Sequence, residues 1–178
     1  MARIDLTQVD LTRLIPFCVF AVSVFALGNA YTAQYAFGLE PCILCLYQRV
    51  PYAVAGTLGV VAFLLPRNKT DWKGHAVALS GGVFLIGAGI AFYHVGVEQH
   101  WWASVAACGA SGGGPGDVGE PQTVDQLRQM LMQAKPVKAC DEVDWTLFGL
   151  SMATYNVPFS LALALASLWG AKHLRRMR

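Results

Sequence analysis

Long uncharged stretches separated by short polar segments dominate the pattern of this chain. No Asp, Glu, Lys or Arg occurs in residues 14–39, 50–66, 76–93 and 145–171. Each stretch is near or above the ~17 to 25 residues that cross hydrocarbon as a helix, and the alternation typical of barrel strands is absent. Helices satisfy their backbone hydrogen bonds internally in lipid. We therefore predict an all-α membrane protein with four transmembrane helices over about 14–37, 48–66, 76–97 and 153–172.

The composition supports this prediction. Of the 178 residues, 55% are hydrophobic and only 13% are charged, against roughly 25% charged residues in soluble domains. A soluble domain is thereby excluded. The first apolar run resembles a secretory signal, because basic residues precede it and small residues occur at 30–33. It is longer than a signal core, so we expect an uncleaved first helix and a single membrane domain over 1–178.

Basic residues are unevenly distributed among the segments that connect the apolar runs. Nine of the 13 fall before the first run, between the second and third runs, or after the fourth run. By the positive-inside rule these segments are cytoplasmic, so we expect both termini in the cytoplasm and the loops at about 38–47 and 98–152 outside. The bundle is then antiparallel. With a net charge of only +2 spread in this way, nucleic-acid binding is disfavoured.

Two cysteines separated by two residues, Cys42 and Cys45, lie in the short gap between the first two apolar runs. A disulfide between them closes so few residues that it constrains little chain entropy, so a structural role does not explain the pair. Such small rings exchange readily. Cys45 falls just before the second helix, whose N-terminus favours a thiolate, and Arg49 adds positive charge one turn later. The pair predicts a redox site at the membrane surface, with Cys45 as the electron donor.

The second outward loop carries Cys108 and Cys140. With 31 residues between them, a bridge would contribute roughly 3 to 4 kcal/mol in the loop-entropy model, so a structural and an exchangeable bridge are equally good interpretations. A glycine-rich stretch at 109–116 follows Cys108, and a capping box predicts a short helix over 123–134. The fifth cysteine, Cys18, is expected to be a packing residue inside the first helix.

Metal and nucleotide sites are poorly supported by the sequence. A second CxxC or an HxxxH pair, which zinc sites usually supply, is missing, so we predict that the chain binds no metal. A match to G-x-G-x-x-G at 114–119 follows no predicted strand and contains a proline. Nucleotide binding is therefore rejected.

The motif Pro-Cys-x-Leu-Cys-x-Tyr-Gln-Arg occupies 41–49, and a later loop supplies Cys108 and Cys140. In this combination of motif and topology the chain resembles the DsbB family, multi-pass proteins of the bacterial inner membrane that form disulfide bonds. The resemblance covers nearly the whole chain, including His94 near the end of the third run and the segment 145–150 before the fourth. The glycine-rich part of the second loop departs from the family pattern.

The resemblance implies an enzyme, a thiol:quinone oxidoreductase that reoxidises a periplasmic thioredoxin-like partner, DsbA. The partner would attack Cys108, and the released Cys140 would attack Cys42. Cys45 would then pass electrons to a membrane quinone, either ubiquinone or menaquinone. Arg49 is expected to hydrogen-bond this quinone. The ordinary interpretation of such an arginine is snorkelling toward lipid headgroups.

His94 has two interpretations, because a histidine at a helix end commonly only caps backbone carbonyls. The resemblance implies that it lies beside the quinone, although Tyr47, Gln48 and Glu98 are within similar reach. Two alternatives to a general DsbA oxidase also stay open. One is a relative that oxidises a single dedicated partner, and the other is a membrane scaffold with two structural disulfides.

Overall fold

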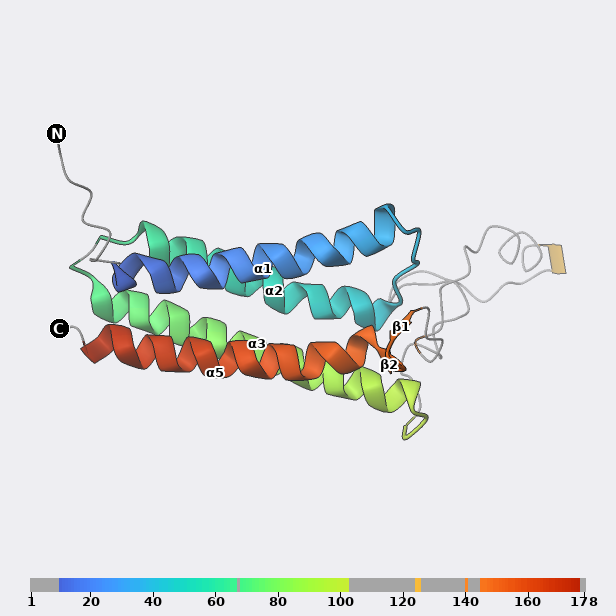
Figure 1. Cartoon of the computed structure of the whole chain (residues 1–178). Helices are drawn as coiled ribbons and strands as arrows, with labels where there is room; N and C mark the ends of the chain where they lie inside the picture. Colours follow the sequence, from blue (N-terminus) through green and yellow to red (C-terminus); the bar gives the residue numbers. More distant parts are fainter. Residues whose placement is uncertain (1–9, 67, 103–123, 126–139, 141–144, 177–178) are drawn as a thin grey trace.

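Helices make up most of the described part of the chain, which in this computed structural model comprises residues 10–66, 68–102, 124–125, 140 and 145–176. Within these ranges the long helices are α1 (Leu11–Tyr35), α2 (Ile43–Leu64), α3 (Thr70–Glu98) and α5 (Met152–Arg176). Two short strands, β1 (Thr146–Leu147) and β2 (Leu150–Ser151), precede α5 (Figure 1). The predicted all-α architecture is confirmed for these residues.

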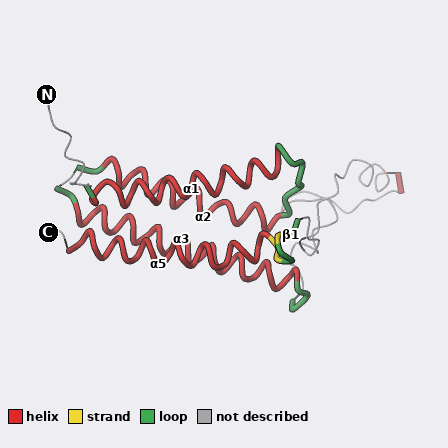
Figure 2. The backbone as a smooth tube through the Cα atoms, viewed as in Figure 1, coloured by secondary structure: helices red, strands yellow, loops and turns green. Residues whose placement is uncertain are grey.

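The long helices form one elongated bundle. α3 packs most extensively against α5 and then against α2, whereas α1 packs mainly against α2 and makes few contacts with α3 or α5. The first residues of α1 and the last residues of α5 lie at the same end of the bundle (Figures 1 and 2). The connection from α1 to α2 and the two strands lie at the opposite end. Residues 36–42 and the end of α3 are thereby brought together.

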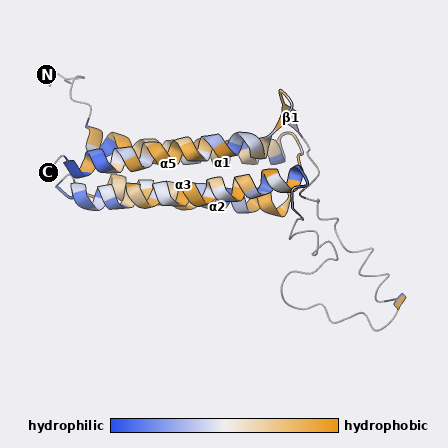
Figure 3. Ribbon diagram, turned by 90° about the horizontal axis from the view of Figure 1, so that it is seen from below, coloured by the Kyte–Doolittle hydropathy of each residue, from blue (hydrophilic) through white to orange (hydrophobic). Residues whose placement is uncertain are grey.

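The outward surface of the bundle is apolar. α1, α3 and α5 are each long and apolar enough to cross a membrane. Large side chains are exposed along their length, among them Phe25, Leu79, Leu165 and Trp169, and hydrophobic colouring runs along the bundle with the strongest hydrophilic colouring at its ends (Figure 3). A helix that is apolar on its outward face as well as in the core is typical of a membrane span. α2 carries Gln48 and Arg49 in its second turn, which interrupts its apolar run.

Small residues allow the helices to approach closely. An added Cβ at Gly59 of α2 would lie 2.9 Å from the backbone nitrogen of Phe20 in α1, and one at Gly81 of α3 would lie 3.0 Å from Leu168 in α5. Backbones meet at such contacts, as in other membrane bundles. Gly82 and Gly89 of α3, by contrast, have no neighbour within 4 Å of an added Cβ. They face away from the helix contacts.

Two residues lie in surroundings that differ from the expectation. Cys18, expected to pack inside the bundle, is exposed on α1. A thiol is apolar enough to lie on an outward membrane face at little cost, so its exposure needs no partner. Lys73, counted among the connecting residues, lies inside α3 and is fully buried. Its Nζ donates to the backbone oxygen of Thr12 at 3.1 Å, which joins α3 to the start of α1.

A tight hairpin leads into α5. Thr146 pairs with Ser151 and Leu147 with Leu150, and the two turn residues, Phe148 and Gly149, have φ values of 51° and 79°. Positive φ at both turn positions is the geometry of a type I′ hairpin. The Ser151 hydroxyl accepts from the Thr154 backbone nitrogen at 3.2 Å and donates to the Glu98 carboxylate. The hairpin thus ties the start of α5 to the end of α3.

Candidate functional site

The first turn of α2 holds both cysteines of the CxxC motif. Cys42 is the N-cap residue, and its sulfur accepts from the backbone nitrogen of Cys45 at 3.4 Å. Cys45, expected just before this helix, is its third residue. Both cysteines carry unbonded thiols here, and the Cys42 Sγ donates to the Cys45 Sγ at 3.2 Å. The structure therefore describes the dithiol form of the pair.

Cys42 is the better protected of the two thiols. It is buried, whereas Cys45 is half-buried. Because the Cys42 S–H donates to Cys45 and burial disfavours the thiolate, the pKa of Cys42 is raised from 9.0 to about 12, against a smaller opposing effect from the hydrogen bond with His94. Cys42 thus keeps its proton at neutral pH. Negative charge on the pair is then carried by the Cys45 sulfur.

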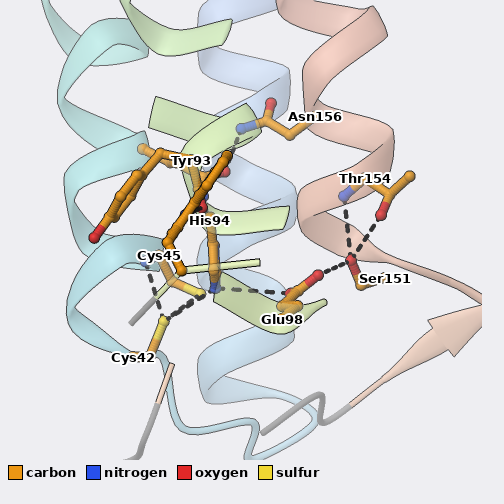
Figure 4. Close-up of polar contacts among 10 residues, drawn as sticks. Cys42, Cys45, Tyr93, His94, Glu98, Ser151, Thr154 and Asn156 are labelled. Carbon is orange, nitrogen blue, oxygen red and sulfur yellow. Dashed lines mark hydrogen bonds and ion pairs between the residues drawn. The ribbon is translucent and has the colours of Figure 1, made fainter. Parts of the chain in front are cut away.

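His94 extends from the last turns of α3 into the same site. Its Nε2 lies 3.6 Å from the Cys42 Sγ and 3.7 Å from a Glu98 carboxylate oxygen. Its Nδ1 lies 2.7 Å from the Nε2 of Gln48 in α2. Figure 4 shows the imidazole between the two cysteines and Glu98. His94 therefore contacts the cysteine pair through its side chain, which a residue that only caps helix carbonyls would not do.

Cys140, from the segment between α3 and β1, reaches this site. It is buried in a cluster with Cys42, Leu44 and Val97. Cys108, the glycine-rich stretch and nearly all of the predicted helix at 123–134 lie outside the described residues. A third cysteine is thus packed against the CxxC motif from a segment nearly a hundred residues later in the chain.

A cavity of about 840 Å³ adjoins the cysteine pair. Its polar lining includes Cys42, Cys45, Gln48, Arg49, His94 and Glu98, and its apolar lining includes Phe25, Leu27, Leu39, Pro158 and Phe159. Volumes of about 300 to 1,000 Å³ with mainly apolar walls and a few polar groups are typical of small-molecule sites. The predicted site residues Cys42, Cys45, Arg49 and His94 therefore share one cavity.

Arg49 is held at the cavity wall by α1. Its guanidinium donates to the Gln34 side-chain oxygen at 2.6 Å and to the Ala30 backbone oxygen at 3.5 Å, and it lies 5.0 Å from the centre of the Tyr31 ring. These contacts fix the plane of the guanidinium. Since arginine has five N–H groups, further donors remain for a ligand.

Several polar residues of the site were not selected from the sequence. Gln48 and Glu98 were named only as being within reach, and they prove to contact His94 directly. Tyr47, named with them, is exposed. Asn156 of α5 was not named as a site residue, although its Nδ2 donates to the Gln48 side-chain oxygen at 2.5 Å. Its polarity within a long apolar run was the available signal, since polar residues in membrane helices usually face the bundle interior.

Cys42, Cys45 and His94 could also serve as ligands to a metal ion. One donor atom from each lies within 4.8 Å of the others. Two sulfurs and an imidazole nitrogen suit soft transition metals. The sequence offered no zinc motif, and the absence of a resident metal stays a prediction.

Comparisons with known proteins agree with the geometry. A family model described as Disulfide bond formation protein DsbB matches residues 12–170. Three similar proteins share the name Disulfide bond formation protein B. The one from Acinetobacter baumannii is 29% identical over 160 residues, covering 88% of this chain and 89% of its own. The one from Xylella fastidiosa (strain Temecula1) is 32% identical over 142 residues, covering 80% and 79%. The one from Neisseria meningitidis serogroup A is 32% identical over 157 residues, covering 85% and 90%. No solved structure matches the chain.

Proposed function

This chain belongs to the DsbB family of disulfide bond formation proteins, and on that premise we propose that it is a thiol:quinone oxidoreductase of the bacterial inner membrane. Its substrate is the reduced form of a periplasmic thioredoxin-like protein of the DsbA type. The observation that carries the proposal is the position of the CxxC pair, which has Cys140 packed on one side and a largely apolar cavity on the other. Such a pair can exchange disulfides with a loop and pass electrons to a lipid-soluble acceptor.

The residues present fit a quinone. The cavity of about 840 Å³ suits a ring with part of an isoprenoid tail. Its apolar residues would contact the tail, and the Arg49 guanidinium, which lines the same cavity, would donate to a ring carbonyl. When bound, a quinone supplies a two-electron oxidation and ends as quinol. Arg49 would stabilise negative charge that develops on the ring oxygen, since a fixed donor in a dry site acts strongly.

Disulfide exchange connects the partner to the CxxC pair. The partner's thiolate attacks the sulfur of Cys108, which breaks a Cys108–Cys140 disulfide and releases the Cys140 thiolate. Cys140 attacks Cys42, so a Cys42–Cys140 bond forms, the Cys42–Cys45 bond breaks, and Cys45 leaves as a thiolate. The partner's second thiolate then attacks its own sulfur in the mixed disulfide, which forms the partner's disulfide and releases the Cys108 thiolate. Cys108 attacks Cys140, so the Cys108–Cys140 bond is restored and Cys42 is released, and the Cys42–Cys45 bond forms again as the pair gives two electrons to quinone. In sum, the partner dithiol loses two electrons and two protons, and these reduce quinone to quinol. The packing of Cys140 with Cys42 supports this order of attack.

We further propose that α2 is the fourth membrane span, with both chain termini in the cytoplasm and both cysteine-bearing segments in the periplasm. α2 has 22 residues and packs between α1 and α3, which is enough length to cross hydrocarbon. Its polar residues Gln48 and Arg49 lie near the end where the helix begins. The basic residues beside the other end of the bundle support the cytoplasmic assignment of the termini.

The proposal is tested with purified protein, reduced DsbA and ubiquinone, with quinol formation followed by absorbance. We expect steady quinol formation by the wild type and none by Cys45→Ser, which should still form a mixed disulfide with the partner at Cys108. Cys18→Ser is the matched control, because Cys18 lies exposed on α1, and it should behave as the wild type. If the wild type forms no quinol and its CxxC pair stays oxidised, the protein is a scaffold and the proposal is wrong.

A further inference from the structure

A line of hydrogen bonds crosses the bundle from α2 to α5 and back. The Tyr52 hydroxyl in α2 donates to the Asn156 side-chain oxygen in α5. The Asn156 side-chain nitrogen donates to the Gln48 side-chain oxygen at 2.5 Å. The Gln48 side-chain nitrogen then lies 2.7 Å from the Nδ1 of His94. Each amide thus accepts from the group before it and donates to the group after it.

The direction of this line decides which nitrogen of His94 carries a proton. An amide nitrogen can only donate, so the His94 Nδ1 that faces the Gln48 nitrogen must accept. A neutral imidazole that accepts at Nδ1 carries its hydrogen on Nε2. That Nε2 lies 3.6 Å from the Cys42 sulfur and 3.7 Å from a Glu98 carboxylate oxygen, and the His94 side chain also hydrogen-bonds to the Cys140 backbone. His94 therefore directs a donor toward Cys42.

The cysteine pair continues the same direction. The Cys42 sulfur accepts a hydrogen bond from the His94 Nε2–H, and its own S–H donates to the Cys45 sulfur at 3.2 Å. Tyr52, Gln48 and His94 are all buried, and an unsatisfied polar group there would be costly. Hydrogen bonds in a row polarise one another in such surroundings. The strengthening of the successive hydrogen bonds therefore acts on the last acceptor, the Cys45 sulfur.

We infer that these six side chains form one donor chain that stabilises the thiolate of Cys45, its members being Tyr52, Asn156, Gln48, His94, Cys42 and Cys45. Asn156 and Gln48 are positioning residues, which act through His94 and do not touch the reacting sulfur. The inference rests on the proposed function and deepens it, since it assigns a means of keeping the Cys45 sulfur ionised in the fully reduced pair, in which Cys42 carries its proton and is not bonded to Cys140. Electron transfer and proton release by the pair are otherwise as proposed above.

The orientation of the donor chain is tested by nitrogen NMR of the reduced protein with labelled histidine, using His94→Gln to assign the signal among the 4 histidines. Spectra are recorded at pH 8.5, about two units above the ordinary imidazole pKa. We expect the proton on Nε2 in the wild type. In Asn156→Asp the carboxylate can only accept, so Gln48 must turn its nitrogen toward α5 and its oxygen toward His94. The proton should then move to Nδ1.

The consequence for reactivity is measured as the rate at which iodoacetamide alkylates Cys45 in the same samples. Once His94 Nε2 accepts from Cys42, the Cys42 proton turns away from Cys45, and the rate should fall about tenfold, as expected for one lost hydrogen bond to a charged sulfur. Gln48→Glu replaces the donor that faces the His94 Nδ1 by an acceptor without any amide rotation, and it should give the same two results. Ser23→Ala removes another buried hydroxyl, one that bonds to the Val19 backbone oxygen outside the chain, and should change neither.

A proton on Nδ1 in the wild type would overturn the inference, even if both variants fail to fold. So would an unchanged alkylation rate in a folded variant whose proton has moved. Neither measurement needs the partner or a quinone, so its result is separate from that of the quinol assay. If the wild type makes no quinol but shows the expected proton and rates, the proposed function fails and the donor chain stands.

Discussion

The protonation of Cys42 gives a quantitative test of the site. In the reduced protein its pKa is about 12 instead of 9.0, because its S–H donates to Cys45 and because the residue is buried. Only the thiolate reacts with iodoacetamide. With a pKa of about 12, the thiolate fraction rises about 1,000-fold between pH 7 and pH 10, whereas with a pKa of 9 it would rise only about 90-fold. Access to the buried sulfur cancels in this ratio.

Alkylation of Cys42 is followed by mass spectrometry at several pH values. Cys45→Ala removes the acceptor of the Cys42 proton while burial persists, so its rise should fall between the two limits. A wild-type rise near 90-fold would refute the reasoning. Because the folded-state pKa lies above 9.0, the interaction stabilises the reduced protein fully below about pH 9 and is lost as the pH rises toward 12.

Three further predictions follow from the bundle. Gly59→Ala should destabilise the protein by about 1 to 3 kcal/mol, because the new Cβ meets the Phe20 backbone at 2.9 Å. Gly89→Ala is the control: it has open space around the new Cβ and should leave the thermal midpoint of unfolding unchanged or raise it. Equal midpoints would contradict the packing. Arg49→Met should weaken apparent quinone affinity by up to about 3 kcal/mol, seen as a higher quinone requirement at unchanged partner KM, while the exposed Arg13→Met is the control. If the variant requires no more quinone than the wild type, Arg49 contacts lipid headgroups and does not bind the quinone. Alkaline phosphatase fused after the last residue should be inactive, and activity there would contradict the topology.

Some of the fold and the site could be predicted from the sequence. The family resemblance, drawn from the motif at 41–49 and the pattern of apolar runs, is confirmed by the family match over 12–170. The start of α2 was placed too late, because the charged Arg49 interrupts the uncharged run and a thiol is a weak and unusual N-cap. Counting apolar residues cannot show that Cys42 begins the helix.

The hydrogen-bonded surroundings of His94 could not be predicted in the same way. Whether Gln48 or Tyr47 faces His94 depends on the rotation of α2 about its axis, and neighbouring residues on a helix point in different directions. The participation of Asn156 depends in addition on how α5 packs against α2 and α3. Apolar periodicity carries little information on these rotations when a helix is apolar on every face.

The sparse contact between α1 and its neighbours α3 and α5 has a consequence for how the acceptor arrives. The cavity wall includes residues of both α1 and α5, two helices that scarcely touch. A hydrophobic molecule that diffuses within the bilayer could therefore enter laterally between α1 and α5 and reach the cysteine pair, while the contact between α3 and α5 stays intact. Under the proposed function, the thioredoxin-like partner would reach the protein from the aqueous side of the membrane, so the routes of the two substrates would not cross.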